Sequence, residues 1–155
     1  PLIIDHSTGV TVTDIVAKSR VWVEKHGVKM IVVDYLQLLR ADGYASREQE
    51  IASYSRAMKL LAKQCDVPVV VLAQINRESA KAGRKPQMSD LRESGALEQD
   101  ADLILMLDRP DSEHKDSDRA GEVDVIVAKN RHGNTGTVVL AHQLHYSKFA
   151  NMVRS

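Results

Sequence analysis

The sequence predicts an α/β fold in which a sheet is parallel in its middle, antiparallel at its C-terminal edge and flanked by helices. Three observations support this prediction. Continuous apolar, β-branched runs occur at residues 30–34 and 69–73, as is typical of strands that helices cover on both faces. A pattern of apolar residues at helical spacing, Ile51 to Cys65, separates them. Two β-rich runs near the C-terminus, 123–128 and 137–142, predict antiparallel strands.

The chain begins with a short apolar run, Leu2–Ile4, which we expect to form a buried strand. A helix should follow, because apolar residues recur at helical spacing after Thr11 and Thr13, either of which can cap its first turn. Gly27 is expected to end this helix. The run at 30–34 is then the first strand of a β-loop-α-β unit.

Residues 37–46 predict a loop, and Pro68 is expected to begin the strand that follows the second helix. The polar stretch 76–99 lacks the periodicity of a long helix and predicts mobile loops around one short helical turn. Another apolar strand is expected at 103–107. The charged segment 108–121 is expected to be a disordered or surface-exposed loop. Glycine and asparagine within Lys129–Gly136 suit a hairpin turn between the last two strands.

Length and composition limit the possible classes of protein. The 155 residues, 43% of them hydrophobic, are enough for one domain with a buried core. Lys plus Arg and Asp plus Glu both total 21, so any contact with nucleic acid must be local. The single cysteine, Cys65, lies on the apolar stripe of a predicted helix, which argues against a disulfide framework and favours a cytoplasmic location.

No apolar run approaches the roughly 20 residues that a membrane span requires, and no signal-peptide pattern precedes the first strand. We therefore expect no membrane partner. Because the sequence starts at Pro1 and runs directly into an apolar segment, we expect it to be a piece of a longer protein.

Two polar residues follow the predicted parallel strands. Asp34 comes directly after Ile31-Val32-Val33, where an acid can hold Mg²⁺ through its water shell, although an Asp that only caps the strand end is equally familiar. Gln74 follows the next strand. Its amide could donate to a γ-phosphate and accept from an attacking water, or it could cap exposed backbone groups.

A third candidate is the block Asp90 to Asp102. Arg92 could pair with a backbone phosphate, Glu93 could orient Arg92, and Gly95 would let a backbone N–H approach another phosphate. The alternative is a solvated loop with a helix start at Ser94. No aromatic residue is interleaved, so base stacking is not supported.

Lys129 and Arg131 form the fourth candidate. Two long cations on a tight hairpin could reach across a subunit boundary and neutralise charge on a transferred phosphoryl group, as an arginine finger does, or they could simply be solvated. His142 and His145 are three residues apart, but the segment between them predicts a strand or turn and not a helix, so both are expected to be packed or exposed.

Taken together, the order and spacing of these blocks resemble the DnaB family of hexameric, RecA-like replicative helicases over essentially the whole chain. The sequences that carry the resemblance are Ile31-Val32-Val33-Asp34-Tyr35-Leu36-Gln37-Leu38, Ala73-Gln74-Ile75-Asn76-Arg77, Asp90-Leu91-Arg92-Glu93-Ser94-Gly95 running into Glu98-Gln99-Asp100-Ala101-Asp102, and Ala128-Lys129-Asn130-Arg131-His132-Gly133-Asn134-Thr135-Gly136.

The resemblance implies a RecA-like P-loop NTPase core over residues 1–155, with ATP and Mg²⁺ as cofactors. It implies that Asp34 is the Walker B acid on Mg²⁺, that Gln74 senses the γ-phosphate, and that Lys129 and Arg131 act in trans on a neighbour's nucleotide. It also implies a pore loop that follows the phosphates of one DNA strand, formed by Arg92, Glu93 and Gly95 and flanked by Asn76-Arg77 and residues 40–46.

The implied partners are single-stranded DNA, five further copies in a homo-hexamer, a helicase loader and a primase. One departure is clear, since no Gly-x-x-x-x-Gly-Lys segment occurs in the sequence, and the family's phosphate loop belongs upstream of Pro1. We therefore expect the isolated chain to be inactive as an ATPase. The alternatives are another RecA-like DNA-dependent ATPase, of the recombinase or branch-migration type, and a non-catalytic module for oligomerisation or partner binding.

Overall fold

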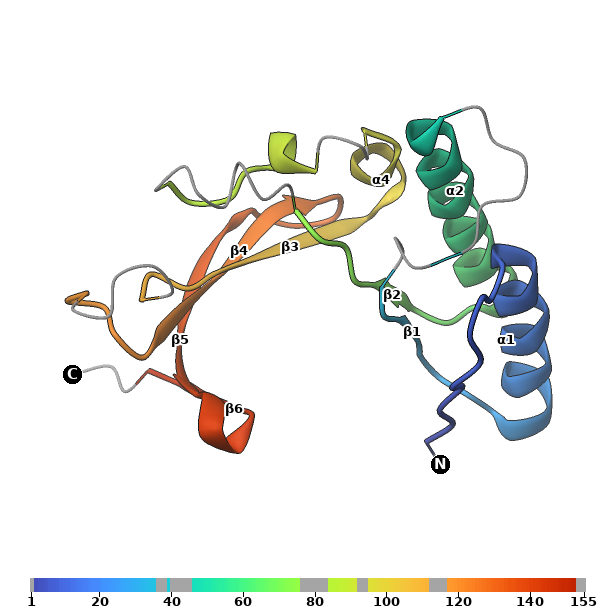
Figure 1. Cartoon of the computed structure of the whole chain (residues 1–155), viewed down its shortest axis with the longest axis horizontal. Helices are drawn as coiled ribbons and strands as arrows, with labels where there is room; N and C mark the ends of the chain where they lie inside the picture. Colours follow the sequence, from blue (N-terminus) through green and yellow to red (C-terminus); the bar gives the residue numbers. More distant parts are fainter. Residues whose placement is uncertain are drawn as a thin grey trace. The chain divides into compact units, whose positions relative to one another are not determined.

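A computed structural model of the chain describes residues 2–35, 39, 46–75, 84–91, 95–111 and 117–152. These residues fall into two compact units, of which the first contains Pro1–Asn76 with Leu91–Ala101 and the second contains Arg77–Asp90 with Asp102–Ser155. Each unit is described by itself, and its elements are drawn in Figure 1. The prediction of a single domain over residues 1–155 stays a prediction. None of the helices within the described ranges is long and apolar enough to cross a membrane.

Helix α1, Val12–His26, begins and ends where the sequence predicts. Thr11 is its N-cap and forms a capping box with Asp14, because each residue's side chain accepts a hydrogen bond from the other's backbone N–H. Gly27 ends the helix in the left-handed conformation, φ 64°, and its N–H donates to the carbonyls of Trp22 and Val23. Both capping predictions are thereby confirmed.

The predicted strand at Leu2–Ile4 is wrong. These residues form neither helix nor strand, and Leu2 and Ile4 are 85% and 61% exposed. An apolar run becomes a strand only where another strand offers hydrogen-bond partners, and no such pairing occurs among the described residues.

Helix α2, Arg47–Cys65, supplies most of the core of the first unit. Its N-cap Ser46 accepts a hydrogen bond from the Gln49 N–H at 3.3 Å. The apolar stripe that predicts this helix faces inward, and it buries Ile51, Tyr54, Met58 and Leu61. The core also contains Ile31, Val33 and Val67.

Strands β1, Ile31–Val33, and β2, Val69–Val71, form a parallel pair as predicted, with Val33 opposite Val71. Helix α2 lies between them in the chain, so the pair is the expected β-loop-α-β unit (Figure 1). The expectation that helices cover both faces of these parallel strands is wrong within this unit. Val32, between the buried Ile31 and Val33, is 57% exposed, because the apolar side chains of α1 and α2 pack only on the opposite face.

The described parts of the polar stretch 76–99, residues 84–91 and 95–99, include two short helical elements where one is predicted. Met88–Asp90 forms a 3₁₀ turn in the second unit. Helix α4, Gly95–Asp100, belongs to the first unit and packs on α2. Ser55 of α2 holds it, since the Ser55 Oγ lies 2.8 Å from Asp100 Oδ2 and 3.3 Å from the carbonyl oxygen of Ala96.

The second unit is built on a four-stranded antiparallel sheet in the order β3-β4-β5-β6. Its strands are β3 Leu103–Asp108, β4 Glu122–Asn130, β5 Gly136–Gln143 and β6 Lys148–Asn151, with a 3₁₀ turn, Leu144–Tyr146, before the last. The predicted strands at 103–107, 123–128 and 137–142 are confirmed, as is the hairpin. The described strands therefore contain one parallel pair, whereas the sequence favours a mostly parallel sheet. β3 pairs antiparallel with β4, and the described residues of the connection between them, 109–111 and 117–121, contain no helix.

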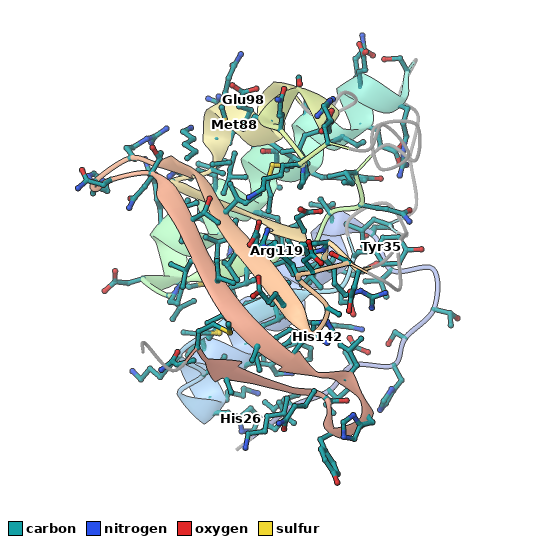
Figure 2. All side chains as sticks on the ribbon, turned by 90° about the vertical axis from the view of Figure 1, so that its left-hand side faces the viewer. His26, Tyr35, Met88, Glu98, Arg119 and His142 are labelled. Carbon is teal, nitrogen blue, oxygen red and sulfur yellow. The ribbon has the colours of Figure 1, made fainter. Side chains whose placement is uncertain are left out.

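The charged segment 108–121 is more than a surface loop. Asp111 accepts a hydrogen bond from the Gly121 N–H at 3.1 Å and lies 3.3 Å from the Nε2 of His142 on β5. Arg119, labelled with His142 in Figure 2, turns back onto β4. The described parts of this segment lie at the surface as expected, since Arg109, Asp118 and Ala120 are exposed, and ion pairs and hydrogen bonds also hold them to the sheet.

Asp124, in the middle of β4, is a fully buried carboxylate with 0% exposure. Arg119 reaches both of its oxygens, with Nη1 3.1 Å from Oδ2, and the Lys85 Nζ lies 2.6 Å from Oδ2. Hydrogen bonds from Arg119, and to a smaller extent from Lys85, lower the pKa of Asp124 to about 2, although burial acts in the opposite direction. Burial and the negative charge of Asp124, its cross-strand neighbour, raise the pKa of Asp108.

We predict that Asp124 makes the second unit sensitive to acid. Its folded-state pKa lies below the ordinary 3.8, so its contribution of about 2 kcal/mol is present above pH 4 and is lost as the pH falls toward 2. Asp124→Asn leaves two cations facing a neutral amide and should lower the free energy of unfolding near neutral pH by about 3 kcal/mol. Urea denaturation of the chain, followed by circular dichroism between pH 7 and pH 2, measures both effects.

The matched control is Asp118→Asn, which makes the same chemical change at an exposed turn position. It should alter the free energy of unfolding by less than about 0.5 kcal/mol. Equal sensitivity of the two variants at neutral pH would contradict the role given to Asp124.

Candidate functional site

Two of the predicted site residues lie at the same edge of the parallel pair. Asp34 follows β1, Gln74 follows β2, and the register Val33 to Val71 brings the two carboxyl ends together. The Leu72 N–H continues the pairing by donating to the Val33 carbonyl at 3.0 Å. Both side chains are exposed. The carboxyl edge of parallel strands is where ligands of α/β folds bind, so the geometry puts a carboxylate and an amide in that place.

The oxygen ligands at this edge suit a hard cation that is held through its water shell. Asp34 offers carboxylate oxygens to solvent, and Mg²⁺ commonly uses one or two protein carboxylates while it keeps several waters. Within the described ranges no group of three or more His, Cys, Asp or Glu side chains gathers in the way that an all-protein metal cage requires. The chemistry available to Asp34 is therefore outer-sphere contact with a cation that another ligand, such as a phosphate, also holds.

The second part of the site is at the end of β4, where the strand carries an irregularity of the β-bulge type. Leu105 pairs with Val127 but Ile104 pairs with Lys129, so Ala128 is an extra residue on β4. Side chains alternate along a strand, and one extra residue changes which face the following side chains occupy. Lys129 and Arg131 consequently share the face of the sheet that carries Asp124, whereas regular pairing would put them on the other face.

The sequence suggests that Lys129 lies in the turn. In the structure it lies within β4, because the ladder to β3 continues through Asn130. Arg131 begins the turn and is 43% exposed. Its backbone N–H donates to the Asp102 carbonyl at 2.8 Å, and its guanidinium Nη1 lies 3.0 Å from Asp102 Oδ1. Asp102 thus contacts both the backbone and the side chain of Arg131.

The turn that follows Arg131 is organised by Asn130. Its Oδ1 accepts a hydrogen bond from the His132 N–H at 3.3 Å, and its Nδ2 donates to the Asn134 carbonyl at 3.4 Å. Gly133 leaves room for this amide, since a Cβ at that position would lie 2.7 Å from Asn130 Nδ2. The turn residues His132 and Asn134 are thereby tied to the strand end that carries Arg131.

Only one residue of the predicted phosphate-gripping group lies in the described part of the chain. Gly95 begins helix α4, and no described atom lies within 4 Å of where its Cβ would be. Packing among the described residues therefore does not explain the glycine. Arg77, Arg92 and Glu93 lie outside the described residues.

Asp90, the first residue of the same predicted block, has a structural role. It is 3% exposed, it accepts a hydrogen bond from the Gln87 N–H at 2.7 Å, and both of its oxygens bind the guanidinium of Arg84. This pairing raises the pKa of Arg84. Together with the Lys85 contact to Asp124, it fixes the segment 84–90 within the second unit.

Sequence reasoning missed Asp102, Asn130 and Asp124 as individual residues. No local signal marks Asp124 as buried, because Val123-Asp124-Val125 shows the apolar and polar alternation of a strand with one face in solvent. Nothing local marks Asp102 as the partner of Arg131, since that pairing depends on the register between β3 and β4.

A carboxylate and an amide at the carboxyl edge of parallel strands, followed in the chain by a hairpin with two cations, form an arrangement of the kind that nucleotide-hydrolysing α/β domains use. The family model for the DnaB-like helicase C-terminal domain matches residues 1–151, and the chain belongs to this family. Its fold class is therefore confirmed as that of the RecA-like ATPase domains of these helicases.

Curated relatives and solved structures agree with this membership. The chain is 50% identical over 156 residues to the replicative DNA helicase DnaB of Mycobacterium intracellulare, and 43% identical over 154 residues to that of Geobacillus stearothermophilus. The alignments cover 99% and 97% of this chain but 27% and 34% of the relatives, so the chain spans about a quarter to a third of their length.

Two solved structures are similar at 42% sequence identity, each with a TM-score of 0.87 over 93% of this chain. One is a solved ATPase domain, of which 52% is covered. The other is a DnaB-like replicative helicase studied for its interactions with primase, of which 36% is covered.

We predict that Gly133 and Asn130 act as one unit in the turn. Gly133→Ala should force the Asn130 side chain to move and so break its bonds to residues 132 and 134, which lowers the free energy of unfolding by about 1 kcal/mol. Asn130→Ala removes the same bonds directly. The double variant should therefore be no less stable than Asn130→Ala alone. Hydrogen exchange of the amides of residues 131–135 should rise equally in all three variants, and additive effects in the double variant would contradict the coupling.

Proposed function

We propose that this chain is the C-terminal portion of the motor domain of a hexameric replicative DNA helicase, which couples ATP hydrolysis to movement along single-stranded DNA and to duplex unwinding. The observation that carries the proposal is the parallel register of β1 and β2, which brings Asp34 and Gln74 to one edge in a chain of the DnaB-like helicase family. The proposal concerns the parent protein, in which the phosphate-binding loop lies upstream of this chain. The isolated chain is expected to be inactive.

Asp34 and Gln74 are proposed to form the nucleotide side of the site. Asp34 is the Walker B acid and orients the water shell of Mg²⁺. The bound cation neutralises charge on the β- and γ-phosphates of ATP. Gln74 hydrogen-bonds the γ-phosphate and the attacking water, and the chain that follows it responds to whether that phosphate is present. Exposure of both side chains supports these roles.

Lys129 and Arg131 are proposed to act on the nucleotide of the neighbouring subunit. Head-to-tail contacts that close into a ring give each subunit one surface that holds a nucleotide and another that faces its neighbour's nucleotide. The bulge at Ala128 supports the assignment, because it moves both cations to the face that carries Asp124, and bulges commonly redirect side chains next to active sites.

Arg77, Arg92, Glu93 and Gly95 are proposed to contact the DNA backbone in the central pore. Arginine and a backbone N–H recognise phosphate without regard to base sequence, as movement along any strand requires. Open space at the Gly95 Cβ position supports a close approach of the backbone at this point.

The further partners follow from the same proposal. A DnaB-like replicative helicase at 42% identity has been studied for its interactions with primase, which supports a primase partner for the parent protein. A helicase loader is proposed because a closed ring must be opened around a DNA strand that has no accessible end. The balanced charge of 21 basic and 21 acidic residues is compatible with a cytoplasmic ring whose cations face inward.

Arg131→Ala tests the assignment in the full-length protein. DNA-stimulated ATP hydrolysis should fall about 10³-fold, because the variant lacks the cation that stabilises the transferred phosphoryl group, whereas the affinity for ATP should change little. Arg109→Ala is the matched control, since Arg109 is an equally exposed arginine that also pairs with an aspartate of the second unit. Turnover of Arg131→Ala within twofold of that of Arg109→Ala would rule out the finger role.

Mixing two variants tests whether Arg131 acts in trans. Rings of Asp34→Asn alone and rings of Arg131→Ala alone should both be inactive. A mixed ring contains interfaces where an intact Asp34 meets an intact Arg131 from the next subunit, so ATP hydrolysis should reappear in mixtures. If mixtures stay inactive although the subunits exchange, as shown by fluorescence energy transfer between labelled copies, action in trans is excluded.

A further inference from the structure

Arg131 is held by one residue at two points. The Asp102 carbonyl accepts from its backbone N–H at 2.8 Å, and Asp102 Oδ1 lies 3.0 Å from its guanidinium. These contacts extend the β3–β4 ladder beyond its last pair, Leu103 with Asn130, so the two residues are cross-strand neighbours on one face. The position of the Arg131 guanidinium therefore depends on where Asp102 lies.

Stability does not explain the carboxylate. The side chains of Arg131 and Asp102 are 43% and 51% exposed, and exposed ion pairs add little to the free energy of folding. What such a pair does provide is orientation, since it restricts a long side chain that would otherwise sample many rotamers. A guanidinium has five N–H donors in a planar fork, so an arginine can contact a carboxylate and a phosphate oxygen at the same time.

The contact between Asp102 and Arg131 matters because of where Asp102 lies in the chain. Asp102 is the last residue of the block that starts at Asp90 and contains Arg92 and Gly95. Helix α4 ends at Asp100, which Ser55 of α2 holds at 2.8 Å, and the chain passes from the first unit into the second between Ala101 and Asp102. A displacement of the block along the chain thus reaches Asp102 through a single intervening residue after the helix.

We propose that Asp102 is the positioning residue for Arg131, and that through it the segment 95–102, which begins at Gly95, controls where the Arg131 guanidinium lies. The inference rests on the proposed function, in which this segment grips DNA and Arg131 serves a neighbour's nucleotide. It adds a physical link between the two within one subunit, through which DNA binding adjusts the finger that acts at the next site.

The test uses the full-length protein and Asp102→Asn, which keeps the backbone carbonyl and the size of the side chain but removes its charge. The kcat of DNA-stimulated ATP hydrolysis should fall about tenfold, as expected for loss of one coupling interaction, while the KM for ATP and the turnover without DNA stay within twofold. Asp102→Glu, which restores the charge, should recover at least half of the stimulated rate. Asp118→Asn is the matched control and should retain the rate of the unmodified protein.

A double-variant cycle separates positioning from a structural effect. If Asp102 acts through Arg131, adding Asp102→Asn to Arg131→Ala should cause no further loss of stimulated turnover. The inference is overturned if Asp102→Asn lowers stimulated turnover as much in the Arg131→Ala background as it does alone. It is also overturned if the stimulated kcat of Asp102→Asn stays within twofold of normal while Arg131→Ala is strongly impaired. Normal turnover of Arg131→Ala instead overturns the finger assignment, and the inference with it. Ring assembly of every variant, measured by light scattering, shows that the comparison is made on intact hexamers.

Discussion

The second unit depends on how the charge of Asp124 is neutralised. An unpaired carboxylate with no exposure would destabilise the sheet by several kcal/mol, so the fold requires cations at this point of β4. Arg119 comes from the connection between β3 and β4, and Lys85 comes from the segment 84–90. One buried carboxylate thereby fixes a connection and a distant segment to the central strand, which itself pairs with both β3 and β5. The hairpin that carries Lys129 and Arg131 grows from this same strand.

The β-bulge at Ala128 then sets the face of the sheet on which each side chain of the hairpin lies. One extra residue, Ala128, moves Lys129 and Arg131 onto the face that carries Asp124 and leaves Asn130 pointing the other way, where its amide organises the turn. Alternation along the strand separates two tasks between neighbouring residues, and the bulge sets the face on which each task is carried out. Arg131 is presented beside Asp102, and Asn130 holds the backbone of the turn. Because each task depends on the phase of the alternation, the pair of cations and the turn residue are displaced together by any change of register.

The parts of this structure that the sequence predicts correctly rest on local signals. Thr11 and Gly27 cap α1 by contacts within a few residues, and the apolar stripe of α2 predicts its buried face. Asp34 and Gln74 could be placed because each directly follows a β-branched run. Leu2–Ile4 carries the same local signal but has no partner strand, and the bulge, the Asp102 contact and the pairing of Asp124 with Lys85 depend on register between segments far apart in the sequence. Periodicity contains no information on such contacts.

The two kinds of ion pair in the second unit differ in what they permit. Asp124 cannot release Arg119 or Lys85 without leaving a buried charge unpaired, so this cluster resists rearrangement when a ligand arrives. Asp102 and Arg131 are both about half exposed, and water can replace either partner at little cost in free energy. In its proposed role, Arg131 must take on a second partner while the first still orients it. This requires an exposed contact of the second kind on a strand that is fixed by the first kind. The placement of Arg131 on a strand fixed by Asp124, but paired with the exposed Asp102, meets both requirements.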